Sequence, residues 1–459
     1  MLAIALPMVI SSACDTLMMF TDRLFLSRTG AENMSAAMGG GLTVFMMTTF
    51  FWGLTSYCTA LVAQYLGSGR KGHCAVAITQ GLIIIAAAYP LILLCRPLGL
   101  LLFQWMHTPP EQLLPQTAYY NILIYATVIM LMRNCLSSFF SGIGRTRVVM
   151  VSALVAMVVN ITLNYIFIFG KLGIPALGIR GAAYGTLIGG MCGLLTLAIA
   201  YLRSENRAEY CVTSSFHFDK AVMGKLLRYG YPAGIELFLN LLAFDLLILM
   251  LHGQGLKTAA AVTVVFNWDM VSFVPLIGVN IGVTSLVGRF MGAGDPDTAH
   301  RATFSGLKLA LLYSFCTLIA FAFFPEPLVS LFRPGRGDTI FSEAFPLAVF
   351  MLRMASLYVM ADAVMLVFSG ALRGAGDTFW AMCISVVLHW IMVSVLAGML
   401  YGLGWTAGPA WVVICVVFML FSGAFYLRYH SGKWRHIRVI EHLPEPVPLT
   451  EGFHGPADI

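Results

Sequence analysis

The stretch Val62-Ala-Gln-Tyr-Leu-Gly-Ser-Gly-Arg70 returns in similar form as Val287-Gly-Arg-Phe-Met-Gly-Ala-Gly-Asp295, 225 residues further along the chain. Pro7 and Pro232, each early in a long apolar stretch, are also 225 residues apart. A repeat of this length, carried by two separate features, predicts that the second half of the chain has the same architecture as the first.

The composition excludes a water-soluble globular protein. Of the 459 residues, 59% are hydrophobic and 10% are charged, and the mean hydropathy is +0.85. Such a chain has too little polar surface to cover a soluble globule and is typical of proteins embedded in a bilayer. Twelve apolar stretches are long enough to cross a membrane as helices. They cover residues 2–27, 38–66, 74–102, 115–141, 148–170, 178–202, 221–251, 259–291, 302–324, 341–372, 378–401 and 409–428.

The twelve stretches fall into two groups of six. The longest interior polar segment runs from Arg203 to Arg228 and separates the groups. We therefore predict an all-α integral membrane protein with two pseudo-symmetric six-helix bundles, a form typical of transporters whose lobes move about a central cavity. The predicted parts are an N-terminal lobe (1–202), a cytoplasmic linker (203–220), a C-terminal lobe (221–430) and a cytoplasmic tail (431–459) that we expect to be disordered.

Lysine and arginine gather in alternate loops, which predicts the orientation of the chain. Fifteen of them belong to one set of loops and the tail, and seven to the other set. Since loops rich in Lys and Arg stay in the cytoplasm, both termini are predicted to be cytoplasmic. The net charge of +6 then follows from topology and indicates no nucleic-acid partner. The ten cysteines are scattered and never form Cys-x-x-Cys, so neither a disulfide framework nor a metal site is indicated.

Ionisable residues inside membrane helices are costly, so each one indicates a candidate functional site. Asp15 and Asp22 are seven residues apart and share one face of the first helix, and Tyr358 and Asp362 are four apart and share one face of the tenth. A desolvated carboxylate disfavours its charged form, so it can hold a proton near neutral pH or exchange it for another cation. The main candidates are Asp15, Asp22, Arg23, Arg133, Glu236, Asp245, Asp269, Arg353 and Asp362.

Neutral polar side chains extend the candidate site around Asp22. Asn160 and Asn164 lie four residues apart on the fifth span, and Thr186 lies on the sixth. Together with Asp22 they can supply oxygen ligands to a Na⁺ ion. Hydrogen bonding between helices is the alternative role for the same side chains.

The seventh and eighth spans carry further acids. Glu236 and Asn240 are four residues apart and share a face, whereas Asp245 lies roughly half a turn away from Glu236. Asp269 in the eighth span either faces the same cavity or binds Arg353 or a neighbouring hydroxyl. Pairing with arginines, which would fix the packing of the helices, is the general alternative to a functional role for these acids.

Together these motifs resemble the multidrug and toxic compound extrusion (MATE) family, in its bacterial NorM-like and DinF-like branches. The resemblance covers residues 2–430 and implies a V-shaped pair of six-helix bundles in the bacterial inner membrane. It also implies export of organic cations in exchange for H⁺ or Na⁺, by a monomer without a further cofactor. The motifs that carry it are Leu6-Pro7, Phe20-Thr-Asp-Arg-Leu24, the paired loops at Gln64 and Arg289, Asn160-Ile-Thr-Leu-Asn164 and Leu372-Arg-Gly-Ala-Gly-Asp-Thr378.

The resemblance implies roles for individual residues. Asp22 matches the first-helix aspartate that controls coupling in the N-terminal lobe of the family. Asn160 and Thr186 match neighbours of that aspartate, which makes the three residues a candidate Na⁺ site. Tyr358 and Asp362 match the tenth-helix tyrosine and aspartate of the family in spacing and context.

The chain departs from the family pattern on the fifth and seventh helices. Asn164 stands where some members carry an aspartate. Many members carry a glutamate eight residues after the seventh-helix proline, and this chain has Asn240 there; Glu236, one turn earlier, is a candidate substitute. Asp245 matches a second acid that some branches carry. The cation site of the C-terminal lobe is therefore expected in an altered form.

We predict a secondary antiporter, not an enzyme, that exports amphipathic, cationic organic compounds in exchange for H⁺ or Na⁺ and is surrounded by membrane lipids. The chain has no Gly-Lys-Ser or Gly-Lys-Thr sequence that would indicate ATP hydrolysis. A flippase for a lipid-linked oligosaccharide is the alternative, but its cavity should gather cations for pyrophosphate, and Arg23, Arg133 and Arg353 are the obvious ones. A lipid-modifying enzyme should gather acids and histidines at one membrane face, whereas the histidines here are dispersed.

Overall fold

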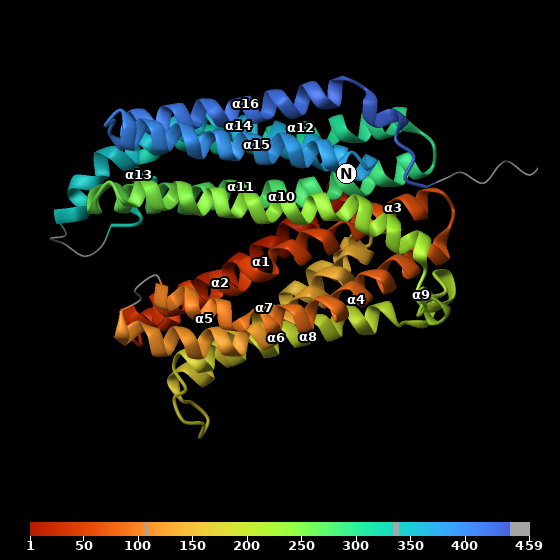
Figure 1. Ribbon diagram of the computed structural model, residues 1–459, viewed down its shortest axis with the longest axis horizontal. Coiled ribbons are helices and arrows are strands. Elements are labelled where there is room, and N and C mark those ends of the chain that lie inside the picture. Colours follow the sequence, from red (N-terminus) through yellow and green to blue (C-terminus); the bar gives the residue numbers. More distant parts are fainter. Residues whose placement is uncertain (106–108, 334–338, 441–459) are drawn as a thin grey trace, which may run out of the picture.

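The computed structural model describes residues 1–105, 109–333 and 339–440, and these residues form helices joined by short loops (Figure 1). Within these ranges, twelve helical segments are long and apolar enough to cross a membrane. They form two lobes that pack together at one end and diverge toward the other, so the molecule has the shape of a V (Figure 1). The prediction of two six-helix bundles is thus confirmed.

The N-terminal lobe surrounds one large apolar core. Its second span consists of two helices that meet at Tyr57, and a short helix follows its third span. The helices of the lobe are α1 (Leu2–Ser27), α2 (Ala31–Ser56), α3 (Cys58–Gly67), α4 (Lys71–Leu94), α5 (Arg96–Trp105), α6 (Pro110–Gly142), α7 (Thr146–Phe169) and α8 (Ile179–Tyr201).

The C-terminal lobe has two apolar cores, one toward each end of its spans. It contains two helices of 37 residues, α11 and α14, which pack along each other. The helices of this lobe are α10 (Lys220–His252), α11 (Leu256–Gly292), α12 (Pro296–Phe323), α13 (Pro325–Ser330), α14 (Thr339–Ala375), α15 (Thr378–Ala397), a π-helical turn (Gly398–Gly402) and α16 (Ala407–His430).

One predicted span is shorter in the structure. The stretch 74–102 was expected to be a single span, but α4 ends at Leu94 and α5 begins at Arg96. Pro97 restricts the backbone of Arg96 and offers no N–H, which favours a helix boundary here. The Arg96 side chain donates to Asn121 Oδ1 (2.8 Å), so a charged group marks the end of the apolar segment.

The repeated Gly-x-Gly sequences are the turns between paired helices. Each has its second glycine at a positive φ that other residues rarely adopt: Gly69 (76°), Gly144 (78°), Gly294 (76°) and Gly376 (95°). The first glycine of each sequence allows close helix packing, because it lies against the backbone of another helix. A Cβ on Gly142 would be 2.8 Å from the carbonyl oxygen of Thr59, and a Cβ on Gly374 would be 2.6 Å from that of Thr284.

The lobes join where the two copies of the repeat cross. A Cβ on Gly67 of α3 would lie 1.8 Å from the carbonyl oxygen of Arg289, and a Cβ on Gly292 of α11 would lie 2.1 Å from that of Gln64. In the repeat, Gly67 is equivalent to Gly292 and Gln64 is equivalent to Arg289. The two contacts are therefore related by a pseudo-twofold axis. Gln64 Nε2 also donates to the carbonyl oxygen of Gly374 (2.7 Å). Only hydrogen at these glycines permits so close a crossing.

The segment between the lobes is tied to the N-terminal lobe. It contains α9 (Ser204–Glu209) and a 3-10 turn (Val212–Ser214). Lys71 Nζ (3.0 Å) and Arg145 Nη2 (3.0 Å) bind the Glu209 carboxylate, and the bond from Lys71 holds the pKa of Glu209 below its usual value. We call this end of the molecule, where the lobes meet, the linker end, and the opposite end the open end.

The prediction that the tail is disordered from residue 431 is wrong for residues 431–440. Trp434, in a 3-10 turn (Lys433–His436), is buried and stacks on Tyr429 of α16 with ring centroids 4.9 Å apart. Val439 and Ile440 are buried in the core of the N-terminal lobe. The apolar side chains of this segment alternate with basic ones and are buried against both lobes. The segment therefore connects the two lobes. Residues 441–459 lie outside the described residues.

Val439→Asp is expected to lower the thermal transition of the purified protein by about 5 °C, because it places a charge in an apolar core. Differential scanning fluorimetry measures the shift. Arg438→Asp is the matched control, because Arg438 is the exposed neighbour in the same segment. Equal transitions for both variants and the wild type would show that residues 431–440 do not stabilise the junction of the lobes.

Candidate functional site

Four of the predicted residues meet inside the N-terminal lobe. Asn164 Nδ2 of α7 donates to Asp22 Oδ1 of α1, and Thr186 Oγ1 of α8 donates to Asp22 Oδ2 (3.3 Å). Asn160 Oδ1 accepts from Asn164 (3.2 Å), and Asn160 Nδ2 donates to Thr186 (3.3 Å). We call these four residues the N-lobe cluster. Asp22 is buried, so three helices direct polar groups to one desolvated carboxylate.

Two glycines of α8 make the cluster possible. A Cβ on Gly185 would lie 1.8 Å from Asn164 Oδ1, and a Cβ on Gly189 would lie 2.8 Å from the carbonyl oxygen of Ala156. The small residues thus let α7 and α8 approach until Asn164 reaches Asp22. Asn164 Oδ1 is buried without a hydrogen-bond partner among the described residues. The amide therefore keeps an unused acceptor, a group that cations take as a ligand.

Sequence reasoning missed Tyr119. This residue of α6 is buried, and its side chain lies beside Asp22 and Thr186. The facing helix leaves room for the ring, since a Cβ on Gly40 would be 3.3 Å and one on Gly41 3.7 Å from it. Tyrosine is common in membrane helices, so without the position of α6 against α1 and α8 the sequence carried no signal for it.

A second group of acids forms in the C-terminal lobe, in which Asp362 is buried and Asp269 is half-buried. Tyr358 Oη of α14 donates to Asp269 Oδ1 of α11 (2.9 Å), and Asp362 of α14 is close enough to Asp269 for direct electrostatic repulsion. We call these three residues the C-lobe cluster. Asp362 is buried and receives no hydrogen bond from a described residue. Two carboxyl groups in apolar surroundings repel each other when both are charged, so a shared proton or metal cation stabilises the pair.

The hydroxyl partner suggested for Asp269 is therefore Tyr358, and the suggested ion pair with Arg353 does not form. Arg353 is exposed and forms no ion pair with Asp269 in the part of the chain that the structure describes.

The three candidates on the seventh span do not join the C-lobe cluster. Glu236 of α10 is buried and binds Arg373 Nη2 of α14 (2.8 Å). Asn240 Nδ2 donates to Ser385 Oγ of α15 (2.8 Å). Asp245 is half-buried and has no ion pair or hydrogen bond with a described side chain. The expected shared face of Glu236 and Asn240 thus contacts the helices α14 and α15.

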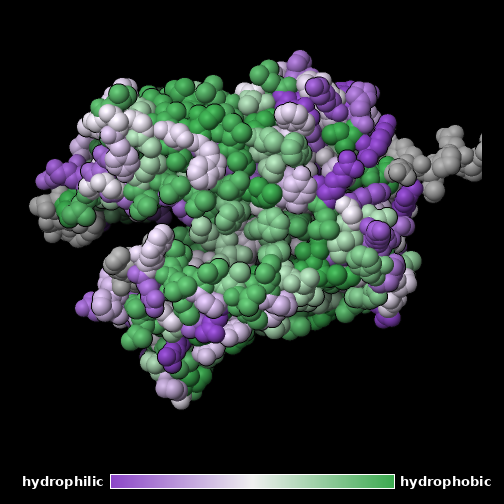
Figure 2. Space-filling model, in the orientation of Figure 1, coloured by the Kyte–Doolittle hydropathy of each residue, from purple (hydrophilic) through white to green (hydrophobic). Residues whose placement is uncertain are grey.

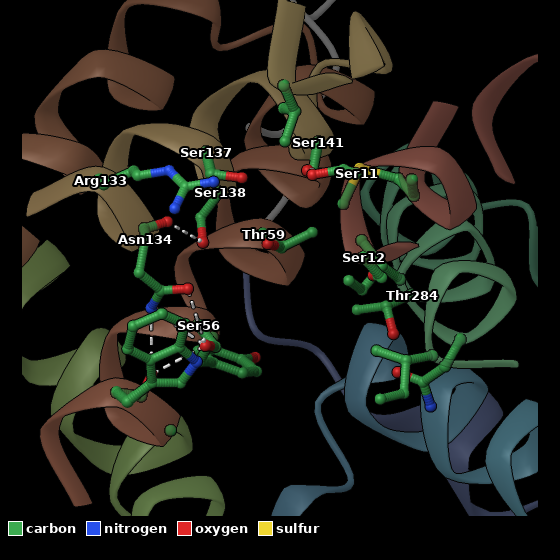
Figure 3. A pocket seen from close by; sticks show the side chains of 18 of the residues that line it. Ser11, Ser12, Ser56, Thr59, Arg133, Asn134, Ser137, Ser138, Ser141 and Thr284 are labelled. Atoms are coloured by element: carbon green, nitrogen blue, oxygen red, sulfur yellow. Dashed lines mark hydrogen bonds between the residues drawn. The ribbon is translucent and has the colours of Figure 1, made fainter. Parts of the chain in front are cut away.

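A cavity of about 400 Å³ lies between the lobes, in the half of the spans nearest the linker end (Figure 3). Helices of both lobes line it, among them α1, α2, α6, α10, α11 and α14. At the open end, a cleft separates the two lobes on the face shown in Figure 2. The cavity lining is rich in hydroxyl and amide groups, including Ser11, Ser12, Ser56, Thr59, Asn134, Ser137, Ser138, Ser141 and Thr284.

Three charged side chains line the cavity. Asp15 and Arg133 form an ion pair of 3.0 Å within the N-terminal lobe, the pairing that the sequence left open for Asp15. Arg373 comes from the C-terminal lobe, near the end of α14. Sequence reasoning placed Arg373 in a loop, because it could not tell that α14 continues to Ala375 and turns this side chain toward α10.

The two clusters offer different sets of oxygen ligands. Among the described residues, no three His, Cys, Asp or Glu side chains gather to hold a metal ion. The N-lobe cluster combines one carboxylate with amide and hydroxyl oxygens, and the C-lobe cluster combines two carboxyls with a phenol. Neutral oxygens with a single carboxylate are ligands that hard cations accept.

The comparisons with known proteins agree with this architecture. The family model MatE matches the chain twice, at residues 7–166 and 232–397, so its two copies begin 225 residues apart like the repeat in the sequence. The Probable multidrug resistance protein NorM of Pasteurella multocida is 28% identical over 406 residues, which are 85% of this chain and 84% of the relative. The multidrug resistance protein MdtK of Yersinia enterocolitica is 26% identical over 408 residues, 88% of this chain and 87% of the relative.

Solved structures share the fold. A MOP superfamily transporter from Pyrococcus furiosus superposes with a TM-score of 0.86 at 20% identity, covering 95% of this chain and 96% of that one. A multidrug resistance MATE family transporter in an outward-facing conformation superposes with a TM-score of 0.84 at 19% identity, covering 94% of both chains. With the MatE model matching more than half of its residues, this multi-pass membrane protein belongs to the MatE family of transporters.

Proposed function

We propose that the chain is a secondary antiporter that exports amphipathic, cationic organic compounds in exchange for H⁺ or Na⁺, and that it works as a monomer. The observation that carries the proposal is the pair of acid clusters inside the helix bundles, one in each lobe, in a protein whose two lobes together line a cavity. Buried acids without arginine partners are costly unless they bind a cation during function. The names of the NorM and MdtK relatives support export of drugs.

The linker end is proposed to be the cytoplasmic side of the bacterial inner membrane. Lysine and arginine gather in the loops at that end, where Figure 2 shows a hydrophilic surface. Both termini would then be cytoplasmic. In this orientation the structure is closed toward the cytoplasm by the crossing of α3 and α11, and the cleft opens outward.

Exchange of the coupling ion for the organic cation follows if ions bound to the clusters and substrates bound in the cavity stabilise different conformational states. A proton or Na⁺ that enters from outside binds Asp22 or the Asp269–Asp362 pair. In the N-terminal lobe it neutralises the desolvated charge of Asp22, and in the C-terminal lobe it removes the repulsion between the two carboxylates. The lobe then packs differently against the cavity, and an organic cation is released. Each ligand shifts the equilibrium only by its difference in affinity for the two states, so the exchange requires the cation to bind one state more tightly.

The cavity argues against the flippase alternative. A pyrophosphate carries several negative charges and needs several free cations. Of the arginines suggested for that role, Arg23 and Arg353 are exposed and do not line the cavity, and Arg133 is already paired with Asp15. The remaining cavity arginine, Arg373, is paired with Glu236.

The proposed function is tested with purified protein in proteoliposomes loaded with a fluorescent organic cation. A pH gradient and a Na⁺ gradient are imposed separately. Dye movement against its own gradient, driven by one of the two, is the expected result and identifies the coupling ion. Absence of movement under both gradients, together with lipid scrambling by the same preparation, would replace the proposal with the flippase.

Gly185→Ala is expected to reduce coupled export severely, because the added methyl group displaces Asn164 from Asp22. Adding Asn164→Ala to this variant should cause no further loss, since the displaced amide no longer contributes. The initial rate of dye export measures both effects. Gly190→Ala is the control, because the nearest atom to its Cβ is 3.8 Å away. A wild-type rate for Gly185→Ala would exclude a role for the close packing of α7 and α8.

A further inference from the structure

The chain that follows α16 is anchored on the C-terminal lobe. Gly432, at a φ of 70°, turns the chain after the helix, and Trp434 Nε1 donates to the carbonyl oxygen of Tyr429 (2.9 Å). Arg435 Nη1 binds Asp297 Oδ1 at the start of α12 (2.9 Å). The Trp434 side chain belongs to the apolar core at the linker end of this lobe. The 3-10 turn is therefore fixed to α12 and α16.

The next four residues lie in a seam between two parts of the protein, and we call residues 437–440 the strap. A Cβ on Gly376, in the turn between α14 and α15, would overlap with Val439 Cγ2 and lie 3.3 Å from Ile437 Cγ2. The same Cβ would lie 3.8 Å from the ring of Tyr229 in α10. The strap therefore lies where the α14–α15 turn meets the first third of α10.

That first third of α10 is held by the N-terminal lobe. The backbone N–H of Asp219 donates to Gln80 Oε1 of α4 (3.3 Å), and Gln80 Nε2 donates to the carbonyl oxygen of His217 (2.9 Å). Tyr229 stacks on Tyr57, at the junction of α2 and α3, with ring centroids 6.0 Å apart. The strap thus lies between a turn of the C-terminal lobe and a helical segment that is attached to the N-terminal lobe.

Burial of the strap depends on the closed linker end. Val439 is 4% exposed and Ile440 is 3% exposed, and both belong to the apolar core of the N-terminal lobe, whereas the anchor at Trp434 belongs to a core of the C-terminal lobe. When the lobes separate at this end, a segment anchored on one lobe loses its burial on the other. Exposing apolar side chains to water is unfavourable, so the strap stabilises the closed linker end relative to the open one.

We infer that the strap is a conformational lock, which occupies the seam only while the linker end is closed and must leave the seam before this end opens. The anchor at Trp434 keeps the released strap on the C-terminal lobe, so it binds again when the lobes close. The inference rests on the two states of the proposed exchange but not on the identity of the substrate or the coupling ion. Displacement of the strap shifts the equilibrium toward the state with an open linker end.

The test compares two truncated variants that differ in the strap alone. One variant ends after His436 and lacks the strap, and the other ends after Ile440 and keeps it. Amide hydrogen exchange of each purified protein, without substrate or an ion gradient, is followed by mass spectrometry. Segments 62–70 and 287–295, where the lobes cross, report opening of the linker end. Segment 344–352 of α14, toward the open end, is the reference.

Without the strap, exchange in both crossing segments is expected to become about tenfold faster, because the open state is more populated, and exchange in the reference segment should not increase. The variant that ends after Ile440 should match the wild type. Equal exchange in the two truncated variants would overturn the inference. Faster exchange in the reference segment as well would also overturn it, because the strap would then stabilise the whole fold and not one state.

A full-length variant decides the question if the shorter truncated variant does not fold. Val439→Ser removes one apolar side chain from the core, so about threefold faster exchange in the crossing segments is expected. Arg438→Ser, at an exposed position of the strap, is the control. Equal exchange for Val439→Ser, Arg438→Ser and the wild type would overturn the inference and leave the export function intact. Absence of gradient-driven dye export would instead contradict the export function.

Discussion

Asp362→Asn is expected to abolish coupled export and to leave the protein folded. Asp362 is 5% exposed, lies beside Asp269 and accepts no hydrogen bond from a described residue, so its structural contribution is small and its charge is available to a coupling ion. Asparagine has nearly the same volume but takes up no proton at physiological pH and offers no negative charge to a Na⁺ ion. Export driven by a pH or Na⁺ gradient is therefore expected to fall to the background of empty liposomes.

Asp22→Asn is expected to give the same loss through the N-terminal lobe. An asparagine there can still accept from Asn164 through its Oδ1, and its Nδ2 can donate to Thr186 Oγ1, which then donates to the carbonyl oxygen of Ala182 (3.0 Å), so the N-lobe cluster keeps its packing while it loses its negative charge. Asp297→Asn is the control for both variants, because that acid is 73% exposed and pairs with Arg435 at the linker end. Size-exclusion profiles establish folding. Wild-type export by both Asp22→Asn and Asp362→Asn would eliminate these acids as ion sites.

Gly67→Val is expected to prevent the linker end from closing. Any Cβ at this position lies 1.8 Å from the carbonyl oxygen of Arg289, and the equivalent Cβ on Gly292 lies 2.1 Å from that of Gln64. The obstruction is backbone, which cannot move aside as a flexible side chain does, so α3 and α11 must separate. Because the proposed exchange requires the closed linker end in one of its two states, Gly67→Val and Gly292→Val are both expected to lose transport.

The separation is measured by pulsed electron paramagnetic resonance between spin labels at Ser68 and Ala293, the positions beside the two glycines. The inter-label distance should increase in both valine variants. Gly224→Val in α10 is the control, since no atom lies within 4 Å of its Cβ. A wild-type distance in Gly67→Val would show that the crossing does not hold the linker end closed.

The fold was accessible to sequence reasoning because it depends on features that repeat. Apolar length defines the spans, and the spacing between Pro7 and Pro232 reappears in the two matches to the MatE model. Helix ends were less accessible. The boundary at Cys95 depends on a proline and a charged residue inside an apolar stretch, and the burial of Val439 depends on a surface that both lobes create.

The N-lobe cluster was predictable because its members share helix faces and a recognisable family pattern, and the structure brings all four together. The C-lobe cluster was predictable in part, since Tyr358 and Asp362 share one helix face whereas Asp269 is on another helix. The partners of Glu236 and the hydroxyl lining of the cavity were not predictable. They depend on which helices of the two lobes face each other. The presence of a serine or an arginine at one position does not indicate which helix it will face.

The most direct test of the exchange mechanism is the affinity of purified protein for a fluorescent organic cation, measured by fluorescence polarisation while pH and Na⁺ concentration are varied separately. If the clusters release the substrate when they bind the coupling ion, the wild-type affinity falls as one of these two cations increases, and a variant with both Asp22→Asn and Asp362→Asn shows no such dependence. A wild-type affinity that stays constant across both series would contradict antiport through these acids.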